Sequence, residues 1–231
     1  FIATSPEKQI KISQFFLKNN ISLILEKPIS TNMHSINKLI EINKIYKKLI
    51  IVNYVYLHHP LISHLKKKLL RSKEKISHIE TIGGDNKPER KFISTLFDWG
   101  PHDLSILLYF IKNPIINNIN FKKNFRRKNY KINLQSKETS ISSICFGNNF
   151  KFKTRKIKIF TDKNFYELNL ISNTIFDKNK KKLKIKFIDS SIQNMLNYFY
   201  NNFKNKKIIN RDLIFSKYIT NILLAVQKKI V

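Results

Sequence analysis

Residues 1–28 read FIATSPEKQIKISQFFLKNNISLILEKP, and this stretch decides the fold. The short apolar run at residues 1–4 predicts a strand. In residues 5–20, apolar side chains follow Pro6 at helical spacing. Proline suits the first position of a helix. Residues 21–25 are continuously apolar, as in a strand that is buried on both faces of a parallel sheet. The stretch therefore predicts a strand–helix–strand unit.

The same alternation continues further along the chain. A second helix is expected over about residues 31–46, and a second buried strand over residues 49–54. Strands that alternate with helices in this way indicate a doubly wound α/β fold. We therefore assign residues 1–58 to a partial, Rossmann-like parallel sheet domain.

The pattern of apolar and charged residues changes after residue 58. We assign residues 59–231 to a second, α+β domain with a mostly antiparallel open sheet. Residues 115–188 are rich in strand patterns, and residues 156–160 and 182–188 alternate strictly between apolar and charged side chains. Such alternation marks antiparallel strands with one covered face and one wet face. Helices are expected at about residues 61–70, 98–111, 190–203 and 211–229.

The formal charge of +29 raises the question of nucleic-acid binding. The 44 lysines and arginines are spread along the whole chain and accompany only 4 glycines, a bias that an A/T-rich genome produces by itself. We therefore expect no nucleic-acid binding beyond nonspecific attraction. A noncatalytic, basic remnant domain that binds RNA or another anionic partner stays open as the alternative function.

Other functional classes are disfavoured by simple features of the sequence. Cys145 is the only cysteine, so no internal disulfide exists, which fits a reducing, cytoplasmic location. No apolar run approaches the ~20 residues that span a bilayer. His58, His59 and His64 lack the spacing and partners of a metal site, so we expect no metal.

The first candidate site is the tripeptide Glu26-Lys27-Pro28. It ends a buried strand, and ligands of open α/β sheets bind in the crevice beyond the strand ends. Pro28 holds Lys27 in an extended conformation and is compatible with a cis peptide bond. The turn would fix an amine in the crevice. A solvent-facing Glu-Lys pair at a strand end is the alternative.

The second candidate is DWGPH, which places Asp98 and His102 four residues apart. If a helix begins by Trp99, both side chains lie on one face of its first turn. His102 can then exchange a proton near neutral pH, and a nearby carboxylate can orient it. The alternative makes Asp98 an N-cap and His102 a packed residue.

Taken together, the order TSP, EKP, VNY, HP and DxGPHD resembles the Gfo/Idh/MocA family of NAD(P)-dependent oxidoreductases over essentially the whole chain. The resemblance implies that the cofactor is NAD or NADP and that the substrate is a sugar, nucleotide sugar or polyol. It also implies a possible homo-oligomer that forms through the antiparallel sheet.

The resemblance assigns roles to individual residues. Lys27 would polarise the substrate oxygen, His102 would take the proton of the substrate hydroxyl, and Asp98 would orient the histidine or the substrate. The protein's task is to position the reacting carbon and to manage one proton, since hydride transfer belongs to the cofactor. Residues that would bind the cofactor, besides Lys27, are Thr4, Pro6, Glu26, Pro28, Asn53 and Tyr54.

The chain departs from the family pattern in three places. It carries no G-x-G-x-x-G phosphate turn, and Phe1 falls where the family's fourth strand would begin. We therefore expect roughly the first third of the Rossmann domain to be missing. The segment before Asp98 is not glycine-rich, and Ser105 stands where many members carry an Asp.

Overall fold

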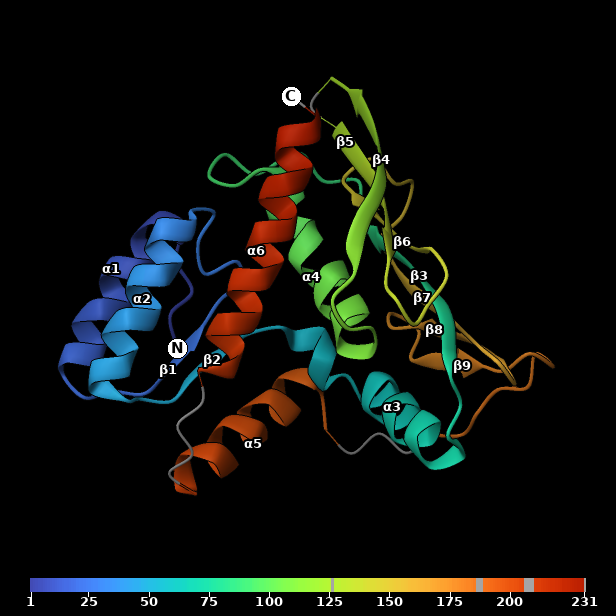
Figure 1. The fold of residues 1–231 in the computed structure, drawn as a ribbon, viewed down its shortest axis with the longest axis horizontal. Helices are drawn as coiled ribbons and strands as arrows, with labels where there is room; N and C mark the ends of the chain where they lie inside the picture. Colours follow the sequence, from blue (N-terminus) through green and yellow to red (C-terminus); the bar gives the residue numbers. More distant parts are fainter. Residues whose placement is uncertain (126, 186–188, 206–209, 231) are drawn as a thin grey trace.

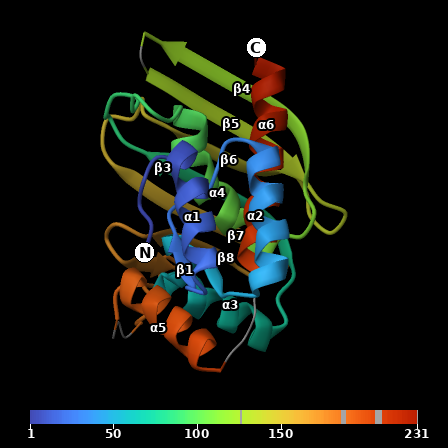
Figure 2. The same ribbon diagram turned by 90° about the vertical axis from the view of Figure 1, so that its left-hand side faces the viewer.

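The first part of the chain forms a small parallel sheet. The computed structural model describes residues 1–125, 127–185, 189–205 and 210–230. In it, β1 (Leu23–Leu25) pairs in parallel with β2 (Ile50–Val52), and every residue of both strands is buried. The helices α1 (Pro6–Lys18) and α2 (Met33–Tyr46) precede and follow β1 and lie side by side in Figures 1 and 2. The predicted α/β pattern is confirmed here.

Residues 1–4 do not form the predicted strand. Only Ile2 pairs with β1, through a bond from its N–H to the Ile24 carbonyl and a bond from the Glu26 N–H to its own carbonyl. The chain then turns at Ser5, the N-cap of α1, so the extended segment is too short for a ladder.

The rest of the chain builds a mixed sheet of seven strands. Their order is β4-β5-β6-β3-β7-β8-β9, and only the neighbours β3 and β6 are parallel. The mostly antiparallel sheet was predicted. The strands are β3 (Ile76–Gly84), β4 (Ile115–Asn124), β5 (Arg127–Gln135), β6 (Ser142–Gly147), β7 (Thr154–Thr161), β8 (Phe165–Asn169) and β9 (Thr174–Phe176).

The strand expected at residues 182–188 is wrong for its described part. Residues 182–185 make one isolated bridge, between Lys182 and Phe176, and residues 186–188 lie outside the described residues. The neighbour that they would extend, β9, has only three residues, so it offers no longer ladder. The apolar and charged residues alternate as in a strand, but β9 is too short to pair with a strand of that length.

Helices cover one face of the large sheet and link it to the small one. A 3₁₀ turn, η1 (Val55–His58), follows β2 and leads into α3 (Pro60–Ser72). In the core, α4 (Thr95–Phe110) packs on β3 and β6, and α6 (Arg211–Ile230) contacts α4, α2 and β2. Figure 1 shows α6 standing between α2 and α4, with α5 (Ser191–Lys204) against η1. Across the described residues, no helix is both long and apolar enough for a membrane span.

Candidate active site

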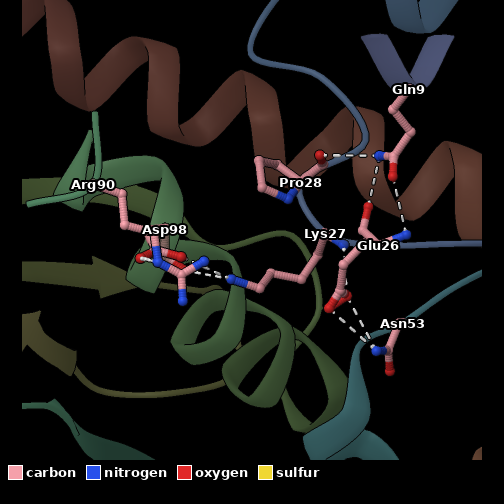
Figure 3. Close-up of polar contacts among 7 residues, drawn as sticks. All are labelled: Gln9, Glu26, Lys27, Pro28, Asn53, Arg90 and Asp98. Atoms are coloured by element: carbon pink, nitrogen blue, oxygen red, sulfur yellow. Dashed lines mark hydrogen bonds and ion pairs between the residues drawn. The ribbon is translucent and has the colours of Figure 1, made fainter. Parts of the chain in front are cut away.

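The Glu26-Lys27-Pro28 turn leaves the carboxyl end of β1, and its Lys27–Pro28 peptide bond is cis. A side chain of α1, Gln9, holds this turn. The Gln9 amide nitrogen donates to the carbonyl oxygens of Glu26 at 2.8 Å and Pro28 at 3.3 Å. Its Oε1 accepts from the Glu26 N–H at 3.2 Å (Figure 3). Three bonds from one buried amide therefore fix the backbone on which Lys27 is mounted.

From this turn, Lys27 reaches across to the start of α4. Its Nζ donates to the carbonyl oxygen of Asp98 at 2.6 Å and lies 3.3 Å from the carboxylate Oδ1 (Figure 3). The other carboxylate oxygen lies 3.3 Å from Nε of Arg90. Burial lowers the pKa of the Lys27 ammonium, while Asp98 and Glu26 oppose that shift. Two residues 71 positions apart thus form one ionic contact.

The helix that carries Asp98 and His102 begins earlier than predicted. It starts at Thr95 with Ser94 as N-cap, so the helix has begun by Trp99, as the shared face requires, and Asp98 is not its N-cap. Pro101 lies inside the first two turns, where its ring removes one backbone donor. Because one turn separates positions 98 and 102, both side chains lie on one face, and both line the same cavity.

His102 is not bonded to Asp98. Its ring packs edge-on against the Tyr56 ring, with 5.0 Å between the centroids and 75° between the planes. Its Nδ1 is shielded from solvent and has no hydrogen-bond partner among the described residues. Burial, reinforced by the positive charges of Lys27, Arg155 and Arg90, holds the pKa of His102 well below 6.5. The imidazole is therefore neutral at physiological pH and can accept a proton.

A cavity of about 390 Å³ opens between the turn after β1, η1 and the start of α4. Cations and anions are mixed in its wall, as expected of a site for a polar ligand. Its lining residues are Glu26, Lys27, Val55, Tyr56, Asp85, Lys87, Pro88, Glu89, Arg90, Thr95, Asp98, Trp99, His102, Asn148 and Lys153.

The other candidate residues divide into two groups. Asn53 lies beside the turn, where its amide nitrogen donates to both carboxylate oxygens of Glu26 at 3.1–3.2 Å. Its buried Oδ1 has no partner among the described residues. Burial raises the pKa of the Glu26 carboxyl, against the opposing effects of Lys27 and Asn53.

Five candidates are not among the residues that line the cavity: Pro28 and Asn53, which lie at or beside the turn, and Thr4, Pro6 and Tyr54. Thr4 is exposed, and Pro6 is buried at the start of α1. Tyr54 turns away, because its hydroxyl donates to the Ser216 hydroxyl of α6 at 2.8 Å. The sequence pattern placed Tyr54 at the strand end but could not give the direction of its side chain, which its contacts with Ser216 and Phe215 of α6 decide.

Three buried polar residues around the site were not predicted from the sequence. Gln9 shares the inward face of α1 with Ser13 and Leu17, and a polar residue on such a face was the available signal. Arg155 lies in register with the inward residues of β7, two positions before Ile157. Asp103 pairs with it. Elsewhere in the described chain, no three His, Cys, Asp or Glu side chains gather closely enough to hold a metal ion.

Comparison with known proteins gives structural likeness without sequence likeness. No family model matches the chain, and no curated protein matches it in sequence. Levoglucosan dehydrogenase, solved with NADH and L-sorbose, superposes with a TM-score of 0.84 at 12% identity, over 98% of this chain and 76% of that one.

Two further solved structures agree. UDP-N-acetylglucosamine 3-dehydrogenase from Acidithiobacillus ferrooxidans gives a TM-score of 0.82 at 13% identity, over 97% of this chain and 76% of that one. A Gfo/Idh/MocA family oxidoreductase from Vibrio cholerae gives 0.79 at 13% identity, over 99% and 76%. At such identities the likeness shows the fold alone, which this chain shares with that Gfo/Idh/MocA family oxidoreductase and with the two dehydrogenases.

Proposed function

We propose that this chain, which has the Gfo/Idh/MocA fold, is part of an NAD(P)-dependent oxidoreductase. The reaction would transfer a hydride between nicotinamide and a hydroxyl or keto carbon of a sugar, nucleotide sugar or polyol. One observation carries this proposal: a neutral imidazole with an unpartnered Nδ1 lines the same cavity as the Lys27 ammonium.

The two side chains divide the work on a substrate hydroxyl. The His102 imidazole accepts the hydroxyl proton as the hydride leaves the carbon. The Lys27 ammonium donates a hydrogen bond to the same oxygen and stabilises the negative charge that develops there. Asp98 holds the ammonium in place through its carbonyl and carboxylate oxygens. When bound, NAD(P) supplies the hydride chemistry itself.

The residues present fit the reacting end of the cofactor. Lys27, Glu26 and Pro28 stand at the carboxyl end of β1, where open α/β sheets bind nucleotides. The buried Asn53 Oδ1 has no partner in the described part of the chain and is an acceptor of the kind that a carboxamide N–H uses. The four glycines, at positions 83, 84, 100 and 147, do not form a phosphate-binding turn. These residues therefore fit the nicotinamide end of the cofactor, and they give no evidence about a site for its phosphates.

The sugar-type substrate class rests on the character of the cavity and on the neighbours. A wall of mixed charged side chains suits a ligand with many hydroxyl groups. Two structural neighbours are named for carbohydrate substrates, one for UDP-N-acetylglucosamine and one for levoglucosan. Assembly into a homo-oligomer, the boundary near residue 59 and the RNA-binding alternative remain predictions.

The fluorescence of Trp99 provides the test. Trp99 is the sole tryptophan and lines the cavity, so reduced nicotinamide bound there should quench its emission and accept its energy. We expect saturable quenching when the natural polypeptide is titrated with NADH or NADPH, and weaker binding in Lys27→Met.

Two controls make the titration specific. ADP-ribose lacks the nicotinamide and should give no energy transfer, and Trp99→Phe should abolish the signal but not the binding heat. If neither reduced nucleotide quenches Trp99 or produces a binding heat, the proposed function fails.

A further inference from the structure

A buried ion pair lies behind the cavity. The Arg155 guanidinium of β7 donates from Nη1 to Oδ2 of Asp103 in α4 at 2.5 Å. The two side chains are only 2% and 0% exposed. Taking two charges out of water is costly, and such a pair is often no more stabilising than apolar side chains of similar volume. Stability alone therefore gives little reason for this pair to lie here.

The guanidinium packs against two aromatic rings that belong to the cavity wall. Its central carbon lies 4.7 Å from the ring centre of Tyr56 and 5.2 Å from that of Trp99. Both rings line the cavity, and the Tyr56 ring is the one that packs edge-on against His102. Side-chain contacts thus run from Asp103 through Arg155 and Tyr56 to the imidazole.

The sheet leaves room for this arrangement at one position. Gly83 of β3 is the register partner of Arg155, so both residues project on the same face. A Cβ at Gly83 would overlap the guanidinium, with all three of its terminal atoms closer than an ordinary contact. The glycine therefore allows the arginine side chain to cross over β3 toward α4.

The charged groups that act on the pKa of His102 are cations. The carboxylate of Asp103 is engaged by Arg155, and that of Asp98 is shared between Lys27 and Arg90. Three cations lower the pKa of the imidazole in addition to burial. The groups that face it from the surrounding elements are Lys27 and Glu26 after β1, Tyr56 of η1, Arg90 before α4, Asp98 and Trp99 of α4, and Arg155 of β7.

We propose that Asp103 and Arg155 are positioning residues, which hold the Tyr56 ring against His102 and the Trp99 ring beside the guanidinium, and set a fixed positive charge behind the imidazole. Their place in the reaction rests on the proposed function; their action on His102 does not. Asp103 aims the guanidinium, the guanidinium holds the two rings, and the Tyr56 ring fixes where the imidazole meets a substrate hydroxyl.

Titration of His102 by NMR tests this inference without any need for activity. The chain has 6 histidines, so the His102 signal can be assigned by its loss in His102→Asn. We expect the pKa of His102 to rise when both charges are removed in Asp103→Asn with Arg155→Met, because one of its three cations is gone. Arg155→Lys keeps the charge and should leave the pKa low. Arg211→Met removes an exposed arginine on α6, and as the matched control it should leave the pKa of His102 unchanged.

The outcomes are decisive in either direction. An unchanged His102 pKa in the folded double variant overturns the inference. If the double variant does not fold, Arg155→Lys decides: its flexible ammonium cannot clamp two planar rings, so the Trp99 emission should shift. Emission and ring contacts identical to those of the natural protein would then overturn the inference.

Kinetics separate positioning from a merely structural role. In substrate oxidation, the acidic limb of kcat/KM reports protonation of the free base, and it should move to higher pH in the double variant. Arg155→Lys should lower kcat about tenfold to a hundredfold by misplacing the imidazole, with the limb unmoved. If the protein shows no oxidoreductase activity, the proposed function fails, but the NMR titration still decides the effect on His102.

Discussion

Replacing His102 with Asn should lower the turnover of substrate oxidation by about 10²–10⁴-fold, the usual contribution of a positioned general base. His102 lines the cavity, its Nδ1 has no partner among the described residues, and the low pKa keeps the ring neutral, so it is ready to take a proton. Asn has a similar size but cannot accept a proton near neutral pH. Steady-state rates with NAD(P)⁺ measure the loss, and quenching of Trp99 by NADH should be retained.

The sign of the pH dependence follows from the same shift. Because the pKa of His102 lies well below 6.5, oxidation should stay fast as the pH falls through 6.5 and fail only at lower pH. His64→Asn is a matched control, since His64 is exposed on α3 and away from the cavity. Turnover of His102→Asn within twofold of His64→Asn would remove His102 from the mechanism.

Lys27→Met should lower turnover by about 10²–10³-fold, the effect of removing one hydrogen-bond donor from a developing oxyanion. The ammonium reaches the site by bonding the Asp98 carbonyl at 2.6 Å, and Met keeps the apolar length of the side chain without the charge. The pKa of Lys27 lies below 10.5, mainly through burial, so the natural rate should also decline as the pH rises toward that value. Single-turnover rates separate this effect from weaker cofactor binding.

A second partly buried lysine offers the matched control. Lys66 donates to the Tyr109 carbonyl at 2.9 Å and lies over the rings of Tyr109 and Phe110, far from the residues of the cavity. Lys66→Met should lose comparable packing and leave turnover within about twofold, because neither Lys66 nor its partners Tyr109 and Phe110 line the cavity. Equal losses in the two variants would mean that Lys27 acts through stability alone.

The elements that a local pattern specifies were predicted well. The apolar run at residues 21–25 and the first-turn proline at position 6 each describe their own neighbourhood, and the structure has β1 and α1 there. The strand expected at residues 182–188 failed for a reason outside its own sequence, because β9 is too short to pair with it.

The site itself depends on contacts that no local pattern contains. The spacing of Asp98 and His102 put them on one helix face, but the helix start at Thr95 and the bond from Lys27 to Asp98 come from tertiary packing. Arg155 reads as one more cation in a lysine-rich chain, although its register with Ile157 pointed inward. Its buried position could be recognised only with the knowledge that its partner Asp103 lies on the helix packed against the sheet.

Transfer of deuterium tests the central claim most directly. The natural polypeptide is incubated with reduced nicotinamide that carries deuterium at its transferable position, together with keto sugars and keto nucleotide sugars, and the products are analysed by mass spectrometry. We predict carbon-bound deuterium in a sugar product, with far less in His102→Asn. A protein that binds NADH beside Trp99 yet delivers no deuterium to any of these substrates, or delivers it equally without His102, would contradict the account.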